Sequence, residues 1–312
     1  MHCYRMLGSL AEAEDLAQET FLRAWKSRDG FEGRASARTW LYRIATNACL
    51  DVLARRPRRV LPDQLGPAGE PDGPITAVDL PWLEPYPDRL LDAAADDVGA
   101  AVVERETIEL AYLAAVQYLP PRQRAALILR DVLGWSAKET AALLETSVAS
   151  ANSALQRARA TLRERLPAHR AEWTVGDPTA GEAALLKRFI AAYEHGDPAA
   201  VSRLLHEDAR AVMPPYSLWF GSRASIVRAL SLSMDPASPH CIGRFRMRPT
   251  RANRRPAVAT YLRRTGEDRY RWFGVTVLDI ENGLITAMAA FESVPAAAWG
   301  LPQEWPAEQE SE

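Results

Sequence analysis

Hydrophobic and polar positions recur with helical periodicity over residues 9–26. The stretch opens with a capping box formed by Ser9 and Glu12. Five apolar residues then follow one face of the helix, and we predict that this face is core: Leu10, Ala13, Ala17, Phe21 and Ala24. The opposite face is polar, so the pattern indicates a half-buried amphipathic helix.

The same periodicity extends through the first half of the chain. A second helix is predicted over residues 37–55, with an apolar stripe at Trp40, Leu41, Ile44, Ala48 and Val52. Shorter helices are predicted over residues 98–118, 121–133, 137–144 and 148–165. Pro121 suits a first helical position, and Ser136 with Glu139 forms another capping box.

Between the second and third helices the periodicity is lost. Residues 62–87 contain seven prolines, which remove backbone donors and prevent a regular helix. The stretch from Pro57 to about Pro87 is therefore predicted to be a linker, and we take DLPWLEPYPD as its central phrase.

After Trp173 the pattern changes class. Helices are predicted over residues 180–194, 198–205 and 222–233, and strands over ARAVMP, GRFRMRPT, AVATYLRR, YRWFGVTVLDI and LITAMAAFESV. The turns GED and ENG separate the last three strands, and Asn282-Gly283 is a strong hairpin signal. A few helices with a long antiparallel meander predict an α+β domain.

The composition is that of an average globular protein of about two domains. The chain has 312 residues, of which 47% are hydrophobic and 25% charged. Cys3, Cys49 and Cys241 are far apart, so neither a zinc site nor a disulfide framework is expected. No apolar run reaches the roughly 18 residues of a membrane span, and no signal-peptide pattern opens the chain. We interpret the protein as cytoplasmic, with no cofactor and no membrane partner.

Charge is segregated along the chain. Residues 1–59 carry 11 Lys and Arg against 7 Asp and Glu, residues 60–119 carry 2 against 12, and residues 120–170 carry 9 against 4. Two basic segments separated by a strongly acidic one suit a protein that holds a polyanion at two places.

Residues 134–165 predict a helix-turn-helix. The first helix is apolar at Ala137, Ala141 and Leu144, and the second is predicted to bury Val148, Ala151, Leu155, Ala158 and Leu162. The N-terminal half of the second helix is polar on its other face, where a recognition helix reads base edges in the major groove. Arg159, Arg163 and Arg165 follow and can reach phosphates. An ordinary helical hairpin with a charged face is the alternative.

Two stretches bear a family resemblance. Residues 119–166, beginning LPPRQRAALILRDVLGW, resemble region 4 of extracytoplasmic-function (ECF) sigma factors, which direct bacterial RNA polymerase to promoters. EDLAQETFLRAW and FEGRASARTWLYRIATNACLD resemble region 2 of the same family, in the same order. The resemblance implies an alternative sigma factor, not an enzyme, with core RNA polymerase and promoter DNA as partners.

The resemblance also implies roles for particular residues. Asp15, Gln18 and Glu19 are expected to bind core polymerase. The alternative is that they only form a solvated acidic face of the helix. Capture of a flipped base of the −10 element falls to Phe31, Arg34, Ser36, Arg43 and Asn47. For Phe31 and the neighbouring Trp40, core packing is the alternative, and for Trp40 we favour it. Reading of the −35 element falls to Ser150, Asn152, Ser153, Gln156, Arg157 and Arg159.

Two further expectations concern the N-terminal half. The acidic linker is expected to follow the cationic RNA path of the polymerase, and a solvated disordered tether is the alternative. Region 2 begins later here than in most relatives, so its first helix is shortened to about HCYRML. We expect a chain extended upstream to bind core polymerase more tightly.

Residues 178–295 resemble SnoaL-like domains of the nuclear-transport-factor fold. The matching phrases are FIAAYEHGDPAAVSRLLHEDA, MPP, WFGSRASIVRAL and the Asn282-Gly283 hairpin. Such a domain follows region 4 in a subset of ECF sigma factors, and PWLEPYPD resembles a linker phrase of that subset. The DGGGR phrase of one branch is absent.

The implied architecture is two all-α sigma domains, the second with the helix-turn-helix, followed by an α+β SnoaL-like cone with a curled antiparallel sheet. The expected limits are 1–59 for region 2, 60–97 for the linker, 98–170 for region 4, 178–296 for the SnoaL-like domain and 297–312 for a tail.

A cavity in the cone is expected to be lined by Tyr216, Trp219, His240, Tyr270, Trp272 and Phe291. His206 and Asp208 lie near a strand start, but no His and Asp stand at a spacing diagnostic of catalysis. We therefore favour a regulatory domain that senses a small apolar ligand or packs on the linker. A cyclase or hydrolase of the SnoaL type fused to a DNA-binding module is the alternative.

Overall fold

The computed structural model divides the chain into two compact units. It describes all residues except 32, 34–35, 93–107, 167–178, 293 and 307–312. Unit 1 comprises Met1–Val60, Pro81–Pro85 and Ala94–Trp173, and unit 2 comprises Leu61–Leu80, Tyr86–Ala93 and Thr174–Glu312. The proline-rich linker therefore contributes segments to both units.

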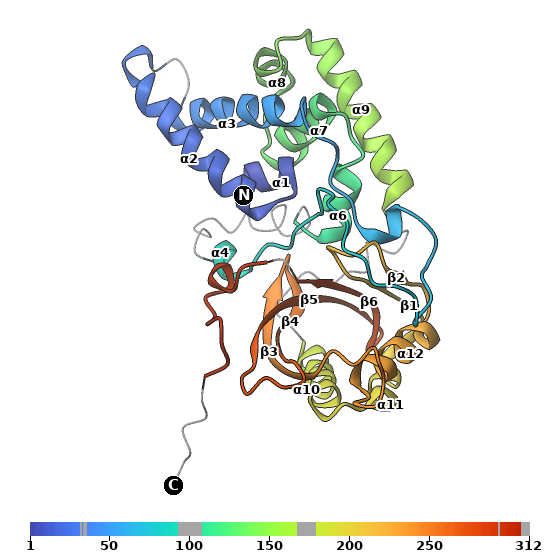
Figure 1. Cartoon of the computed structure of the whole chain (residues 1–312). Coiled ribbons are helices and arrows are strands. Elements are labelled where there is room, and N and C mark those ends of the chain that lie inside the picture. The colour runs from blue at the N-terminus through green and yellow to red at the C-terminus, as the bar shows by residue number, and fades with distance from the viewer. Residues whose placement is uncertain (32, 34–35, 93–107, 167–178, 293, 307–312) are drawn as a thin grey trace. The chain divides into compact units, whose positions relative to one another are not determined.

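Unit 1 is helical (Figure 1). Its helices are α1 (His2–Leu7), α2 (Leu10–Lys26), α3 (Ala37–Leu53), α6 (Leu110–Val116), α7 (Pro121–Leu127), α8 (Ala137–Leu143) and α9 (Val148–Arg165), with a 3-10 turn η1 (Arg28–Gly30) and a π-helical turn η3 (Ile128–Val132). The helices expected from periodicity are confirmed at α2, α3, α7, α8 and α9. The expected helix over 98–118 is described only from residue 108 onward, and the rest of it lies outside the described residues.

One core assignment in α2 is wrong. Leu10, Ala13 and Ala24 are buried, but Phe21 is 64% exposed. Thr20 takes the buried position instead, and its hydroxyl donates to the carbonyl of Leu16 at 2.7 Å. Neighbouring helical positions differ by about 100°, so Phe21 faces outward when Thr20 faces the core.

A buried arginine joins α1 to the segment between α6 and α7. Arg124 is 2% exposed, and its guanidinium donates to the carbonyl of Met6 at 2.5 Å and to both oxygens of Gln117 at 2.9 and 3.0 Å. A longer bond reaches the carbonyl of Leu119. Burial lowers the pKa of Arg124 to about 10, so the group is still a cation at neutral pH. Its charge is stabilised by neutral oxygens from two parts of the unit.

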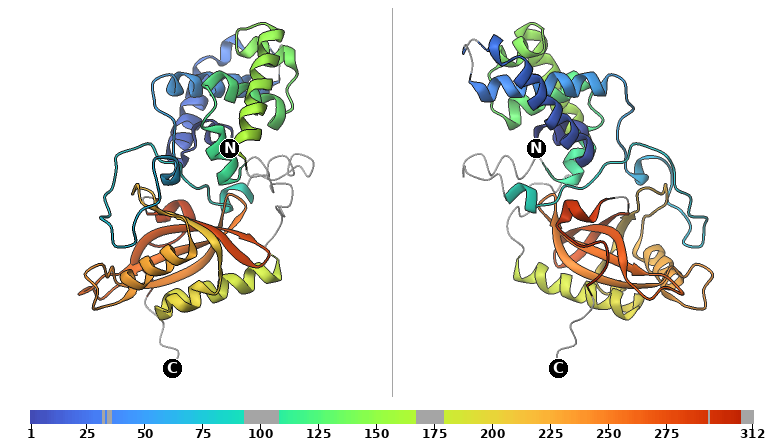
Figure 2. Two further views of the ribbon diagram at one scale, coloured as in Figure 1. Left: turned by 90° about the vertical axis from the view of Figure 1, so that its right-hand side faces the viewer. Right: turned by 60° about the vertical axis from the view of Figure 1, so that its left-hand side comes forward.

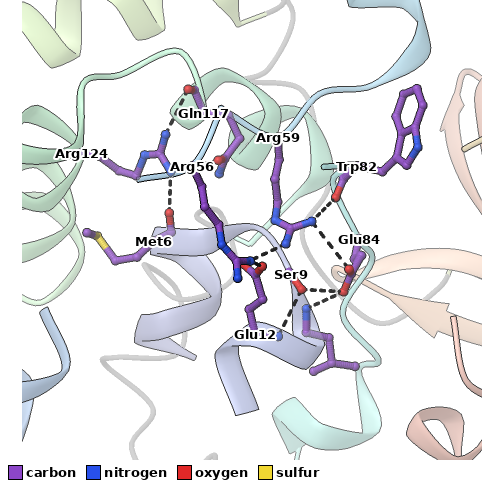
Figure 3. A network of polar contacts seen from close by, with 10 residues as sticks. Met6, Ser9, Glu12, Arg56, Arg59, Trp82, Glu84, Gln117 and Arg124 are labelled. Carbon is purple, nitrogen blue, oxygen red and sulfur yellow. Dashed lines mark hydrogen bonds and ion pairs between the residues drawn. The ribbon is translucent and has the colours of Figure 1, made fainter. Parts of the chain in front are cut away.

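The linker segment Pro81–Pro85 is bound within unit 1 by a polar network (Figure 3). The Glu84 carboxylate accepts from the Ser9 hydroxyl and the Leu10 amide, both at 2.9 Å, so it caps the N-terminus of α2. Arg59 donates to the carbonyl of Trp82 at 2.6 Å and pairs with Glu12 at 2.8 Å. The segment is thus fixed at its centre.

Unit 2 is a six-stranded sheet with helices against one face (Figures 1 and 2). Its strands are β1 (Leu205–Val212), β2 (Trp219–Phe220), β3 (Arg244–Ala252), β4 (Arg255–Arg263), β5 (Arg271–Glu281) and β6 (Leu284–Phe291), in the order β2-β1-β6-β5-β4-β3. The helices are α4 (Arg89–Asp92), α10 (Ala180–His195), α11 (Pro198–Ser202) and α12 (Arg223–Met234), with 3-10 turns η2 (Pro62–Gln64) and η5 (Ala296–Trp299). The core lies between α10, α11, α12 and the sheet, around Phe189, Val258 and Leu278.

The sheet was expected to be antiparallel and curled. In the structure it is mixed and not strongly curled. Strands β3 to β6 follow one another through short turns and are antiparallel, as the turn signals indicated. Strand β1 pairs parallel to β6. No hairpin joins β1 to β6, so the meander does not constrain their relative direction. The helix expected over 198–205 ends at Ser202, because Leu205 already begins β1.

Two other linker segments are bound within unit 2. In the first, Gly66 accepts from the Trp219 indole at 2.9 Å, and the Gly69 and Val78 amides donate to the carbonyls of Trp219 and Pro215 at 2.9 and 3.0 Å. We call residues 66–78 the strap.

The second segment, beginning at Tyr86, extends the β3–β4 hairpin. Asp88 is 3% exposed, accepts from the Arg254 amide at 2.8 Å and pairs with Arg251 at 3.1 Å. Tyr86 and Asn253 exchange two hydrogen bonds of 2.8 and 2.9 Å.

Replacing the buried cation should destabilise unit 1 selectively. We expect Arg124→Met to leave the carbonyls of Met6, Gln117 and Leu119 without a donor and to cost about 2–4 kcal/mol of unfolding free energy. Urea unfolding followed by far-ultraviolet circular dichroism measures this, because most helix lies in unit 1. Arg55→Met, at an exposed position of the same unit, is the matched control. Equal midpoints for the two variants would contradict the structural role of Arg124.

Candidate functional sites

The exposed face of α2 combines apolar and acidic side chains. Phe21, Leu22 and Trp25 are 64%, 55% and 67% exposed. Asp15 and Gln18 are exposed and three residues apart, and Leu22 follows Gln18 by four residues on the same face. Such an apolar cluster is unusual on a free surface and is typical of a protein interface. The sequence analysis assigned Phe21 to the core and did not select Leu22 or Trp25.

Glu19 and Trp25 are each engaged by an arginine of the same segment. Glu19 pairs with Arg23 at 2.8 Å, and this hydrogen bond lowers the pKa of the Glu19 carboxyl. The guanidinium of Arg28 lies 4.4 Å from the centre of the Trp25 ring. The face therefore presents a partly neutralised carboxylate and an aromatic ring covered on one side.

The residues expected at the −10 element gather near the start of α3. The rings of Phe31 and Trp40 are 4.9 Å apart at 36°, and both residues are half-buried. Trp40, Arg43 and Asn47 follow one face of α3 at spacings of three and four, with Arg43 and Asn47 exposed. Ser36 caps α3 by accepting from the Thr39 amide at 3.1 Å. Arg34 lies outside the described residues.

Packing of α3 differs in part from the predicted stripe. Ala48 is buried as expected, together with Ala45, Thr46 and Cys49, whereas Trp40 is half-buried. The Thr46 hydroxyl lies 2.8 Å from the His2 ring, and burial lowers the pKa of His2 to about 3. This histidine is therefore a neutral core group at physiological pH.

Helices α8 and α9 form the predicted helix-turn-helix. The capping box of α8 is present, with the Ser136 amide donating to Glu139 at 2.8 Å and the Glu139 amide donating to Ser136 at 3.2 Å. The residues expected at the −35 element are all exposed on α9: Ser150, Asn152, Ser153, Gln156, Arg157 and Arg159. The prediction that Val148 is buried is wrong, because this first residue of α9 is 44% exposed at the turn.

Arg159, one of the residues expected at the −35 element, forms an ion pair with a residue outside α9. Its guanidinium donates to both carboxylate oxygens of Asp131, at 2.9 and 2.6 Å, and this pairing raises the pKa of Arg159. The pair holds α9 against η3. Arg159 is consequently less available to a phosphate than Arg157.

Unit 2 contains a cavity of about 540 Å³ between the sheet and α12. Tyr216, His240 and Phe291, three of the residues expected there, line it. The volume lies within the range of sites for small organic ligands. Phe245 and Phe273, which sequence reasoning did not select, supply further aromatic wall.

Trp219, Tyr270 and Trp272 lie elsewhere. Trp272 donates to the carbonyl of Val294 at 2.8 Å and packs edge to face on Tyr261. A β-bulge explains the difference: Thr260 pairs with Gly274 but Tyr261 pairs with Trp272, so one extra residue shifts the alternation in β5. Phe273 therefore faces the cavity in place of Trp272.

The remaining aromatic and polar candidates have other surroundings. Trp219 bonds to the strap, and Tyr270 lies beneath the guanidinium groups of Arg246 and Arg263. Asp208 on β1 is exposed, and its carboxylate lies 4.0 Å from the ring of His206.

A hydrogen-bonded pair of acidic groups lines the cavity. The Tyr216 hydroxyl donates to the Glu292 carboxylate at 2.9 Å. Burial raises the pKa of Glu292, and burial together with this hydrogen bond raises the pKa of Tyr216 to about 12. Glu292 was missed from sequence, because it follows β6 and only the tertiary fold turns it toward Tyr216.

Neither a metal site nor a membrane helix is evident in the part of the chain that the structure describes. The described residues include no group of three or more His, Cys, Asp or Glu side chains that could hold a metal ion. None of the described helices is long and apolar enough to cross a membrane.

Comparison with known proteins identifies three parts of the chain. The family models for Sigma-70 region 2, Sigma-70 region 4 and the SnoaL-like domain match residues 2–59, 109–162 and 186–288. The ECF RNA polymerase sigma factor SigG of Mycobacterium tuberculosis is 43% identical over 305 residues, which cover 96% of this chain and 80% of SigG. SigW of Bacillus subtilis is 32% identical over 165 residues, 53% of this chain and 80% of SigW.

A solved structure shares the fold over nearly the whole chain. The crystal structure of the Mycobacterium tuberculosis ECF sigma factor SigJ aligns with a TM-score of 0.57 at 22% identity and covers 97% of this chain and 95% of SigJ. From the match to SigG and the matches to both sigma-70 regions, the chain belongs to the ECF sigma factors, and it carries a SnoaL-like domain at its C-terminal end.

Proposed function

We propose that this sigma factor binds core RNA polymerase through the exposed face of α2. The observation that carries the proposal is the cluster of Phe21, Leu22 and Trp25 beside Asp15 and Gln18, because a monomer does not expose such a cluster without a partner. The apolar residues supply the buried area of the interface, and Asp15, Gln18 and Glu19 supply its polar contacts. The protein acts in the cytoplasm, where the polymerase is.

Promoter recognition is divided between α3 and α9. Phe31, Trp40, Arg43 and Asn47 provide an aromatic surface and hydrogen-bonding edges for a base of the −10 element, whose extrusion costs about a few kcal/mol of stacking. On α9, Asn152, Gln156 and their exposed neighbours enter the major groove at the −35 element. The role assigned to Arg34 rests on the family resemblance alone.

The linker connects these contacts to the SnoaL-like domain. In the free protein its backbone hydrogen bonds are made with both units, at the strap, at Pro81–Pro85 and at Tyr86–Asp88. In the transcribing complex the acidic linker follows the RNA path of the polymerase, so the strap must leave unit 2. The SnoaL-like domain is therefore a regulatory domain that holds the strap and lowers sigma activity. The domain limits expected from sequence are part of this proposal.

The polymerase contact is tested by run-off transcription with purified core polymerase. We expect the wild type to give promoter-specific transcripts from genomic DNA, and Trp25→Ala to bind core polymerase at least about tenfold more weakly. Because Trp25 is exposed, the midpoint of thermal unfolding of Trp25→Ala should equal that of the wild type. Leu65→Ala, which removes another exposed apolar side chain, is the matched control. Transcription by Trp25→Ala at the wild-type level would reject the proposed interface.

Base contacts and phosphate contacts of α9 can be distinguished by measuring binding to a library of promoter sequences. We expect Arg157→Ala to relax the preference at one position of the −35 element, because a base contact discriminates by about 1–3 kcal/mol. Arg163→Ala should weaken binding to all sequences alike and reduce the salt slope by about 1. Binding measured at several salt concentrations provides both quantities. An unaltered sequence preference in Arg157→Ala would show that this residue does not read a base.

A further inference from the structure

The cavity of unit 2 contains a buried hydroxyl without a partner. Thr260 on β4 lines the cavity and is 4% exposed, and its hydroxyl oxygen has no hydrogen-bond partner among the described residues. Leaving a buried hydroxyl unpaired costs about 1–3 kcal/mol. The group is therefore free to bond a molecule that enters the cavity.

Thr260 belongs to a row of residues that crosses three strands. Its pairing partner on the neighbouring strand β5 is Gly274. A Cβ at Gly274 would lie 2.9 Å from the Cα of Glu292, which directly follows β6. All three residues line the cavity. Two strand spacings separate Thr260 from Glu292, which is about 10 Å. The β6 backbone fills the space beside Gly274, because a Cβ there would collide with the carbonyl oxygen of Phe291. The row therefore has polar side chains only at its two ends, Thr260 and Glu292.

The lining favours a neutral and mostly apolar occupant. Phe245, Phe273 and Phe291 form aromatic walls. The two charged groups that line the cavity, Glu292 and Arg264, are of opposite sign, so neither leaves an unbalanced charge for a ligand. Arg264 and Glu292 interact electrostatically with each other, and a charged ligand would lose its hydration in a mostly apolar cavity.

The strap forms part of the cavity wall. Pro71 and Ile75 line it, and Ile75 is 53% exposed in the free protein. Asp72 pairs with Arg228 of α12 at 3.2 Å, and Ala77 bridges to Tyr216, whose side chain bonds Glu292. A molecule that fills the cavity therefore touches the strap directly and reaches it again through Tyr216.

We propose that the cavity binds a neutral, largely apolar small molecule whose hydroxyl or carbonyl oxygen pairs with Thr260, and that this molecule holds the strap on unit 2. Contacts with Pro71 and Ile75 exist only while the strap is docked, so binding favours the docked position. The consequence for transcription rests on the proposed function, in which a docked strap lowers sigma activity. Ligand binding itself does not depend on that function.

The binding site is tested on the full chain with 2-naphthol and naphthalene as probes in equilibrium dialysis. We expect 2-naphthol to bind about fivefold more tightly than naphthalene, which is the effect of one neutral hydrogen bond. In Thr260→Val this preference should disappear while naphthalene binds as before. Thr250→Val, on β3 and outside the cavity lining, should behave as wild type. No binding of either probe, or an equal preference in Thr260→Val, overturns the site.

Two more measurements separate the parts of the proposal. Ile75→Ala should weaken binding of both probes severalfold, and unchanged binding would overturn the contact with the strap. In run-off transcription, 2-naphthol should reduce transcripts from the wild type and not from Thr260→Val. If bound 2-naphthol does not change transcription by the wild type, only the proposed coupling between ligand binding and transcription is overturned. A protein that gives no transcripts under any condition refutes the proposed function and leaves the binding result standing.

Discussion

A segment rich in proline cannot satisfy its own backbone hydrogen bonds in a regular element, and this constraint determines how the linker behaves. Its amides and carbonyls bond instead to residues distant in sequence: Gly66, Gly69 and Val78 to the region around Trp219, Glu84 to Gly8, and Tyr86 to Asn253. An acidic segment that is held in this way is not free to enter another macromolecule. Release of the strap therefore has a free-energy cost that a partner or a ligand can alter.

The binding surfaces and the stabilising contacts use different residues of the same helices. In α2, Thr20 and Ala24 face inward while Phe21 and Trp25 face outward. Along α9, Arg159 is fixed by Asp131, whereas Arg157, two residues earlier, has no such ion pair in the described structure. This separation lets the surfaces that contact polymerase and DNA change without loss of the fold.

Much of the fold followed from local signals in the sequence. The Ser136–Glu139 capping box located α8, and Asn282-Gly283 located the β5–β6 hairpin, because both depend on neighbouring residues. The predictions that were wrong depended on contacts between distant residues or on a shift of a single residue. Thr20 replaced Phe21 in the core, a bulge exchanged Phe273 for Trp272, and β1 paired parallel to β6. Thr260 and Glu292 lie on different elements, so no sequence spacing could have shown that they share a cavity.

The central claim is that the strap is bound to unit 2 in the free sigma factor and released on core polymerase. Amide hydrogen exchange of Gly69 and Val78 measures it directly, because both amides donate to carbonyls of unit 2. The account predicts protected amides in the free protein and exchange at least about tenfold faster in the complex, which corresponds to a loss of roughly 1.4 kcal/mol of local protection. Equal protection of both amides in the free protein and in the complex would contradict it.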